Sequence, residues 1–559
     1  MQTIRITYRQ TVLEVVSGTT IREALCRFGL KDEMSDSYQE NPIIAALVNS
    51  TPRNLESPLL FRATLEPIRL FSDLGKVCYR QSLCFLLAAA AQKAIPDRHL
   101  EIGYALGDGY YFTFTDNLVV SGETVEKLRN AMQALVDDNL PIRPEVLSLG
   151  EAIEWFGGHH GEETVSLLES LNPASIEVYT MGNFHDVVYN VPVPKSGLVT
   201  VWELRQYKLN GILLRYPRSF DFTRLDTYRD NPLLFEALKK DKLQRPILKV
   251  NAIGDLSRFS EEDKLVPYIR LCEAYQAKHI NEIAESIAQR STTRIVFICG
   301  PSSSGKTTFS YKLCTQLEVR GRKAIQLSLD NYYLPPDQCP KDKDGKPNFE
   351  VLEALNLPLL QQNLKDLAAG NPVRLPTYNF QTKKTTFGEP VVQDERTILV
   401  AEGIHAMNPK LSSGIDPELV YRIYISAFTQ VNITDHNRIS TTDNRIIRRI
   451  VRDHRTRNSS AEETLGMMKS VQTGENLYIF PFQNNADVML NSALDYELAV
   501  LSPLAIPLLR RVKPETGEMY VTARRLLRFL TYFQPVSDSL VPQDSLLREF
   551  IGGSEYNVT

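Results

Sequence analysis

The sequence lacks the features that mark membrane, secreted and metal-stapled proteins. Its first residues, "MQTIRITYRQ", contain no apolar signal core, and the apolar run "LCFLLAAAA" at 83–91 is too short to span a bilayer. The seven cysteines are odd in number and form no CxxC pair, which argues against a disulfide or zinc framework. These absences predict a cytoplasmic protein with reduced thiols and no contact with a membrane.

A strong excess of one charge is also missing. The 559 residues include 63 basic and 67 acidic ones, a net charge of −4, and residues 1–225 contain no long run of Lys and Arg. This balance disfavours a nucleic-acid-binding surface over the whole molecule and leaves a local basic patch open. The composition, 43% hydrophobic and 23% charged, is that of a globular protein, and the length predicts about three to five domains.

Residues 1–72 have the pattern of a small sheet with one helix. Ile4 and Ile6 alternate with polar residues as in a strand, "VLEVV" follows as a second short strand, and Thr19 or Thr20 can cap the next helix. This stretch resembles a TGS domain, the ubiquitin-like module of threonyl-tRNA synthetases and some GTPases. The resemblance implies a β-grasp fold.

Residues 73–225 carry a second resemblance. The segments "LCFLLAAAAQKAIPDRHLEIGYALGDGYYFTF" and "ETVEKLRNAMQALVDDNLPI" are similar to the second additional domain of threonyl-tRNA synthetase, an α+β domain that edits mischarged tRNA. By alignment, the four editing positions of that family are here Gln81, Phe85, Val188 and Pro192. None of these side chains is a plausible zinc ligand or proton carrier. We therefore expect the fold without its hydrolytic chemistry.

Helical segments lie on either side of the last large domain. Residues 226–292 are charged and helical in pattern, with Ile269 and Cys272 on one side of a helix that continues to Ile287, and they predict a connector. The segment "VTARRLLRFLTYF" predicts a helix within a C-terminal region, 516–559, that docks on the preceding domain.

The motif with the clearest chemistry is "GPSSSGKTT", a full GxxxxGK[ST] match. It follows the apolar run "RIVFIC" (294–299), which predicts a parallel strand buried on both faces, and it precedes the helical pattern "TTFSYKLCTQLEVRG". Backbone N–H groups of such a loop bind phosphate oxygens, Lys306 bridges the β- and γ-phosphates of ATP, and the Thr307 hydroxyl binds Mg²⁺. The predicted ATP-binding residues of the loop are Gly300, Ser302, Ser303, Ser304, Gly305, Lys306, Thr307 and Thr308.

The identity of the phosphate acceptor depends on residues after the loop. The guanine-reading [NT]KxD of a GTPase is absent, and so is the apolar strand ending in Asp-Glu of a motor ATPase. The next strand pattern, "AIQLSL" (324–329), ends at Asp330, where a carboxylate can take a proton from an acceptor hydroxyl. A helix N-cap is the structural alternative for Asp330.

Residues 293–500 resemble the uridine kinase branch of the uridine kinase/phosphoribulokinase family. Four segments carry the likeness in order: "GPSSSGKTT", "LSLDNYY", "LPTYNF" with "VAEGIHAM", and "RIIRRIVRDHRTR". The resemblance implies that Asp330 is the general base for a nucleoside 5′-hydroxyl and that Glu402 orients Mg²⁺ through water. It further implies an acceptor site made by Tyr333, Glu350, Tyr378, Phe380 and Lys383.

An arginine-rich helix completes the resemblance. Arg445, Arg448 and Arg452 stand at i, i+3 and i+7, which places them on one face of a helix. With Arg455 and Arg457 they are expected to close on the transferring phosphate, where guanidinium donors meet developing negative charge. Arg448 and Arg452 are the expected catalytic arginines, Arg455 and Arg457 the ATP-binding ones, and Arg445 a substrate-binding one.

The acceptor half departs from the family at one position. Where pyrimidine-specific members have a histidine that touches the base, this chain has Lys383, and Asn379 replaces an aspartate. A different nucleoside therefore stays open as the acceptor, and so does a sugar phosphate held by Lys383 and Lys384.

The sequence as a whole predicts an α/β protein whose main domain has the parallel sheet of a P-loop NTPase. We expect five regions, namely 1–72 (TGS-like β-grasp), 73–225 (synthetase-editing-like α+β), 226–292 (helical connector), 293–515 (kinase) and 516–559 (C-terminal helix and tail). The leading function is ATP-dependent phosphorylation of a nucleoside 5′-hydroxyl with Mg²⁺. The alternative is an ATP-binding regulator that contacts RNA or the ribosome through the N-terminal half, and assembly with a second copy of the chain stays open.

Overall fold

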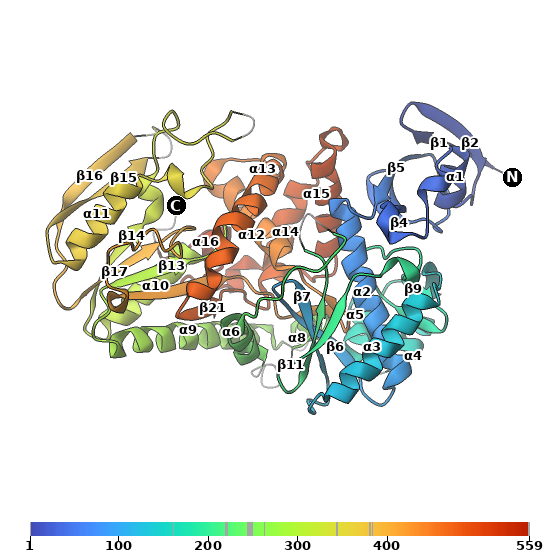
Figure 1. The fold of residues 1–559 in the computed structure, drawn as a ribbon, viewed down its shortest axis with the longest axis horizontal. Helices are drawn as coiled ribbons and strands as arrows, with labels where there is room; N and C mark the ends of the chain where they lie inside the picture. The colour runs from blue at the N-terminus through green and yellow to red at the C-terminus, as the bar shows by residue number, and fades with distance from the viewer. Residues whose placement is uncertain are drawn as a thin grey trace.

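The computed structural model describes residues 2–159, 161–218, 222–242, 250–261, 263–342, 345–379, 382 and 384–556. The chain runs from a small N-terminal sheet at one end of the molecule to a parallel sheet at the other (Figure 1). All seven cysteines are free thiols. Within the described ranges, no helix combines the length and the apolar character that a membrane crossing needs.

The N-terminal sheet has the order β2-β1-β5-β3-β4, in which β1 and β5 are parallel and the other pairs are antiparallel. Helix α1 (Ile21–Arg27) packs its apolar side on this sheet, against Ile4 and Ile6. Thr20 caps α1 through a reciprocal capping box with Glu23, as the sequence predicts. The strands are β1 (Thr3–Tyr8), β2 (Thr11–Val16), β3 (Ile43–Val48), β4 (Thr51–Asn54) and β5 (Ala63–Arg69).

The second region is built around helix α2 (Asp73–Ala94), whose middle, including the alanine run, is buried on nearly every side. A four-stranded antiparallel sheet and a three-stranded one surround α2, with the orders β11-β12-β7-β6 and β10-β9-β8. The strands are β6 (Leu100–Leu106), β7 (Gly109–Phe114), β8 (Arg143–Ser148), β9 (Ser175–Met181), β10 (Phe184–Asp186), β11 (Glu203–Tyr207) and β12 (Gly211–Arg215). The helices beside them are α3 (Gly122–Asp137), α4 (Leu149–Gly157) and α5 (Glu162–Leu171). This α+β arrangement agrees with the predicted fold class.

In the described part of residues 226–292, the helices α6 (Pro232–Lys242), α8 (Ile253–Glu261) and α9 (Leu265–Gln289) join this region to the parallel sheet. The sheet has the order β14-β17-β13-β18-β21 with every neighbour parallel. Its strands are β13 (Ile295–Cys299), β14 (Lys323–Ser328), β17 (Thr397–Glu402), β18 (Val420–Ser426) and β21 (Val488–Asn491). Strand β13 is central and fully buried, which explains its unbroken apolar run.

Helices cover both faces of the parallel sheet. Alternate residues of β13 point to opposite faces, so that Val296 meets α9 and α10 (Lys306–Glu318), while Phe297 meets α6 and α11 (Leu357–Ala368). A hairpin of β15 (Val373–Asn379) and β16 (Lys384–Val391) extends beyond the sheet. The fold is thus the predicted P-loop type of α/β sheet.

The C-terminal third adds a helical layer. It contains α12 (Thr441–Arg457), α13 (Ala461–Gly474), α14 (Glu497–Leu509), α15 (Glu518–Leu530) and the short α16 (Arg548–Ile551). Apolar residues of all five helices share one core. Helix α16 lies against α12 beside the parallel sheet (Figure 1).

A small hairpin ties the two halves together. It consists of β19 (Asn432–Thr434) and β20 (Asn437–Arg438), directly before α12. The Asn432 side-chain amide donates to the Ile102 carbonyl at 2.7 Å, and the Ile102 N–H donates to the Asp435 carbonyl at 2.8 Å. Asp435 also accepts from Thr164 and faces His99 at 2.9 Å. The segment that leads into the arginine-rich helix is therefore held by the N-terminal half.

Candidate functional site

The glycine-rich loop follows β13 and opens helix α10, as its sequence predicts. A Cβ on Gly300 would overlap the Ile425 carbonyl, so this position needs glycine. Ser303 and Gly305 have positive φ angles of 59° and 85°, which curl the loop so that α10 begins at Lys306. The Nζ of Lys306 turns back over the loop and lies 3.1 Å from the Gly300 carbonyl oxygen. The loop thus presents the helix N-terminus and one lysine to a common point.

Buried hydroxyl groups line the same loop. The Oγ atoms of Ser303 and Ser304 are buried and have no hydrogen-bond partner among the described residues. An unpaired buried hydroxyl is costly, so these atoms favour a polar ligand in the loop. Their geometry is compatible with the predicted phosphate cradle.

Two carboxylates converge beside Lys306. Asp330 lies in a 3-10 turn (Leu329–Tyr332) just after β14, and Glu402 is the last residue of the neighbouring strand β17. The pKa of Glu402 is raised to about 7, mainly by burial; Lys306 opposes this rise and the charge of Asp330 contributes to it. Burial likewise raises the pKa of Asp330, against the field of Lys306 and two arginines of α12. The parallel sheet thus brings together three charged residues that are 24 and 72 positions apart from one another in sequence.

Two of the predicted acceptor residues, Tyr333 and Glu350, lie close enough to Asp330 for its charge to raise their pKa. The Tyr333 hydroxyl donates to the Phe349 carbonyl at 3.2 Å, and the Tyr333 and Tyr378 rings lie 6.5 Å apart. Burial raises the pKa of Glu350 to about 7, and the field of Asp330 adds to this rise. Phe380 and Lys383 lie outside the described residues. The roles of all these residues in substrate binding stay predictions.

The predicted arginines divide into groups with different surroundings. Arg445 and Arg448 are buried beneath the loop, where their guanidinium groups donate to the carbonyls of Ser302 and Ser303 at 3.2 and 3.3 Å. A buried glutamate binds each of them: Glu475 pairs with Arg445, and Glu497 pairs with Arg448 at 3.1 Å.

The remaining three arginines lie nearer the surface. Arg452 and Arg457 share the carboxylate of Asp453, at 2.7 and 3.5 Å. The positive charges of both arginines oppose the rise that burial causes in the pKa of Asp330. Arg455 turns away and donates to the backbone carbonyl of Glu549 at 2.9 Å. The structure therefore places Arg452 and Arg457 within reach of the Asp330 charge, whereas Arg445 and Arg448 are bound by buried glutamates.

Sequence reasoning missed several residues around the loop. Arg449 donates to the Ser302 hydroxyl at 3.0 Å and lowers the pKa of Glu350, although it was not among the predicted arginines. Its place next to Arg448 in "RIIRRIVRD" is a signal that could have identified it. No local pattern identifies Glu475, Glu497 or Glu549, because the first two reach arginines of α12, and the third reaches Thr308, from distant segments.

The residues beside the loop fit a magnesium ion. Thr307 and Glu402 supply hard oxygen donors of the kind that Mg²⁺ prefers, and a bound ion would take its other ligands from substrate phosphates and water. Because the charge of Asp330 contributes to the raised pKa of Glu402, a cation near these two carboxylates would relieve their repulsion. No larger cluster of His, Cys, Asp or Glu suited to a metal occurs in the part of the chain that the structure describes.

The four positions that correspond to the synthetase editing site are packed rather than open. Phe85, Val188 and Pro192 are buried, and the Gln81 side-chain amide donates to Asn437 of the hairpin at 2.9 Å. A residue of the kinase half therefore contacts the face of α2 that carries Gln81.

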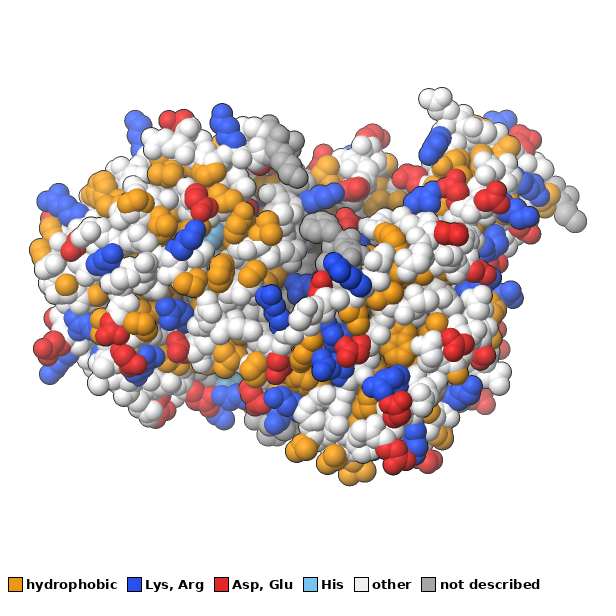
Figure 2. All heavy atoms as spheres, in the orientation of Figure 1, with side chains coloured by type: hydrophobic (Ala, Val, Ile, Leu, Met, Phe, Trp, Pro, Cys, Tyr) orange, Lys and Arg blue, Asp and Glu red, His pale blue; other side chains and the backbone are white. Residues whose placement is uncertain are grey.

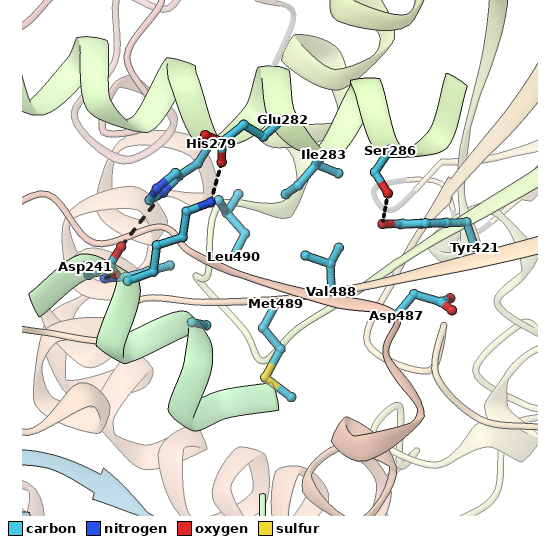
Figure 3. Close-up of a pocket in the computed structure, with 13 residues that line it drawn as sticks. Asp241, His279, Glu282, Ile283, Ser286, Tyr421, Asp487, Val488, Met489 and Leu490 are labelled. Atoms are coloured by element: carbon cyan, nitrogen blue, oxygen red, sulfur yellow. Dashed lines mark hydrogen bonds and ion pairs between the residues drawn. The ribbon is translucent and has the colours of Figure 1, made fainter. Parts of the chain in front are cut away.

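A separate cavity of about 260 Å³ lies between α6, α9 and the edge strand β21 (Figure 3). His279 and Asp241 face each other across one end, and Ser286 and Tyr421 are hydrogen-bonded at 3.1 Å at the other. Burial lowers the pKa of His279 to about 4, so that its imidazole is neutral near pH 7. None of the predicted site residues lines this cavity.

The face seen in Figure 2 mixes both signs of charge. Lys and Arg side chains alternate with Asp and Glu over the N-terminal half, at the right of that view. This distribution matches the balanced composition and offers no extended basic surface on that face.

Known proteins resemble the two halves separately. The model of the phosphoribulokinase/uridine kinase family matches residues 295–499. The uridine kinase of Staphylococcus haemolyticus is 30% identical over 212 residues, which cover 38% of this chain and 93% of that enzyme. The threonine–tRNA ligase of Desulforamulus reducens is 30% identical over 224 residues, 40% of this chain and 33% of the ligase. The chain therefore spans about a third of the length of that ligase.

Among solved structures, that of a possible uridine kinase from Bacillus stearothermophilus aligns with a TM-score of 0.25 and 16% identity. The alignment covers 36% of this chain and 89% of that one.

Proposed function

The chain belongs to the phosphoribulokinase/uridine kinase family, and on this premise we propose that it transfers the γ-phosphate of ATP to the 5′-hydroxyl of a nucleoside. Membership in that family supports an ATP-dependent kinase with a small-molecule acceptor. The observation that carries the proposal is the convergence of Lys306, Asp330 and Glu402 at the mouth of the phosphate-binding loop.

The donor half of the proposed site is the loop and the start of α10. Backbone N–H groups of residues 300–308 hold the β- and α-phosphates, and Lys306 moves from the loop carbonyls to the phosphate oxygens. Thr307 and Glu402 hold Mg²⁺, which when bound neutralises charge on the β- and γ-phosphates. Residues that follow or end two neighbouring strands, β13 and β17, thus share the donor site.

Asp330 starts the proposed transfer. Its carboxylate accepts the proton of the acceptor hydroxyl while the hydroxyl oxygen bonds to the γ-phosphorus and the bond from that phosphorus to ADP breaks. Arg452 and Arg457 lie in the field of Asp330 and supply guanidinium donors for charge that develops on the transferred group. A base whose pKa is raised by burial suits a proton transfer near neutral pH.

The acceptor is proposed to lie between Asp330 and the aromatic pair Tyr333–Tyr378. Glu350 accepts hydrogen bonds from ribose hydroxyls in this proposal, and the aromatic rings contact the base. Phe380, Lys383 and Arg445 complete the proposed substrate-binding set. A sugar phosphate is the second candidate acceptor, favoured by the adjacent lysines 383 and 384.

The N-terminal half is proposed to regulate rather than to catalyse. The likeness of residues 1–225 to threonine–tRNA ligases supports an RNA contact for the TGS-like region 1–72 and the region 73–225. The connector 226–292 and the C-terminal region 516–559 then flank a kinase domain at 293–515. We place the protein in the cytoplasm, where its free thiols stay reduced, with homo-oligomers as a further proposal.

A panel of acceptors tests this function. ADP release is measured with ATP, Mg²⁺ and each of the common nucleosides and sugar phosphates in turn, with Lys306→Ala as the inactive control. One or more nucleosides are expected to raise ADP release at least tenfold above the rate without acceptor. If only sugar phosphates do so, a sugar phosphate replaces the nucleoside as the proposed acceptor. If no acceptor does so, the kinase proposal fails and an ATP-binding regulator is favoured instead.

A further inference from the structure

The C-terminal tail returns to the phosphate-binding loop. Glu549, in α16, places its Oε2 atom 3.1 Å from the backbone nitrogen of Thr308 and 2.9 Å from the Thr308 hydroxyl oxygen. Both groups of Thr308 donate to this carboxylate, although the two residues are 241 positions apart. Thr308 is the third residue of α10, so its N–H is one of those at the start of the helix that have no acceptor within the helix itself.

Those donors are the ones that a bound nucleotide needs. In a loop of this kind the backbone N–H groups at the start of the helix hold the α- and β-phosphates, and their partial positive charge favours an anion. A carboxylate that accepts from both the N–H and the hydroxyl of one residue uses these donors as a phosphate oxygen would. We propose that the Glu549 carboxylate competes with the nucleotide phosphates, so that the tail closes the donor site until it is displaced.

The tail is docked by specific contacts rather than loosely placed. Leu546, Leu547 and Phe550 are fully buried, and Leu546 packs directly over Gly305 of the loop. The Arg448 guanidinium lies 4.8 Å from the centre of the Phe550 ring. Lys312, on α10, donates to the Asp544 carboxylate at 2.9 Å. These contacts hold Glu549 in place over the first turn of α10.

Charge makes joint occupancy unfavourable. The Glu549 carboxylate already lies on the N–H and the hydroxyl of Thr308, next to Thr307 of the proposed metal site. A triphosphate would add several negative charges within the same few ångströms, at the donors that Glu549 uses. Nucleotide binding therefore requires residues 548–552 to move away, and Arg455, which binds the Glu549 carbonyl, is then freed to face the phosphates. This inference rests on the proposed ATP site.

The test compares nucleotide affinity in two variants of the full-length protein. Glu549→Gln keeps the size of the side chain and removes its charge, while Glu555→Gln removes the same charge from an exposed position of the same tail. The dissociation constant for ADP with Mg²⁺ is measured by calorimetry, because ADP isolates binding from turnover. We expect E549Q to bind ADP about tenfold more tightly than wild type and E555Q to stay within twofold.

Hydrogen exchange supplies a second readout that does not depend on any variant. In the wild type, saturating ADP is expected to speed amide exchange in peptides that cover residues 545–556. Slower exchange there, or an E549Q affinity equal to or weaker than that of wild type, would show that the tail supports the nucleotide and would overturn the inference. If the wild type binds ADP and E549Q binds it no better, only this inference fails. If neither binds ADP, the proposed function fails with it.

Discussion

Replacing Asp330 by asparagine separates the acceptor chemistry from nucleotide binding. The substitution keeps the side-chain shape and removes the carboxylate that we assign as the general base. A positioned base contributes roughly 10²- to 10⁴-fold to a rate, so kcat should fall by at least about 10²-fold. ADP binding should be unchanged or slightly tighter. Removing the negative charge of Asp330 leaves the positive charges of Lys306, Arg452 and Arg457 available to the phosphates.

The assay pairs steady-state ADP release with ADP titration on the same samples. Asp337→Asn is the matched control, since Asp337 is an exposed aspartate seven residues further along the chain. D337N should retain wild-type turnover and affinity. If D330N keeps more than a tenth of the wild-type kcat, Asp330 is not the base. If D330N no longer binds ADP, the separation of donor and acceptor residues is wrong.

Three further predictions concern charged residues of the site. The pKa of Glu402 is about 7 in the folded protein, against an ordinary value of 4.5. Between pH 4.5 and 7, the folded protein therefore holds a proton on Glu402 that the unfolded chain has released. The free energy of unfolding consequently falls as the pH rises from about 5 to 7. In metal-free buffer, Glu402→Gln should leave the free energy of unfolding unchanged at pH 4 and raise it at pH 8 by at most about 3 kcal/mol, measured by urea unfolding. Equal effects at both pH values would contradict a raised pKa for Glu402. Arg448→Met should lower stability by about 3 kcal/mol because it leaves Glu497 buried and unpaired, a loss that adding Glu497→Gln should partly restore. Arg452→Met should instead keep the stability and lower kcat by about 10²-fold; if the two arginine variants behave alike, the division of the arginines is wrong.

Local patterns in the sequence were sufficient to predict the strand, loop and helix of the proposed donor site. Strand β13, the loop and α10 are contiguous, and their apolar run, glycine spacing and helical stripe each act over a few residues. Asp330 and Glu402 were also predictable, because parallel strands end at the same edge of a sheet. The fold class follows from the same regularities.

The contacts that close the site were not predictable, because they depend on tertiary packing between distant segments. Glu475 and Glu497 pair with arginines 30 and 49 positions away, and this pairing allows Arg445 and Arg448 to be buried. From the sequence, these two arginines were expected instead to close on the transferring phosphate. Glu549 reaches Thr308 across 241 positions. An arginine or a carboxylate in a sequence does not reveal which partner will neutralise it.

The joint between the halves has the same character. The hairpin of β19 and β20 belongs to the kinase part by sequence, yet Asn432, Asp435 and Asn437 bond to the N-terminal half. The arginine-rich helix begins three residues after that hairpin, at Thr441. A movement of the N-terminal half would therefore also move the start of α12, the helix that carries Arg452 and Arg457. In the proposed regulatory role, residues 1–225 act on the site through this contact.

Phosphorus NMR of the reaction products tests the central claim most directly. The protein is incubated with ATP, Mg²⁺ and a nucleoside, and in parallel with the matching 5′-deoxynucleoside, which lacks the proposed acceptor oxygen. We predict a new phosphomonoester signal and an equal amount of ADP with the nucleoside, neither with its 5′-deoxy analogue, and neither with D330N. Formation of inorganic phosphate alone, or an equal phosphomonoester signal from the 5′-deoxy analogue, would contradict transfer to a nucleoside 5′-hydroxyl.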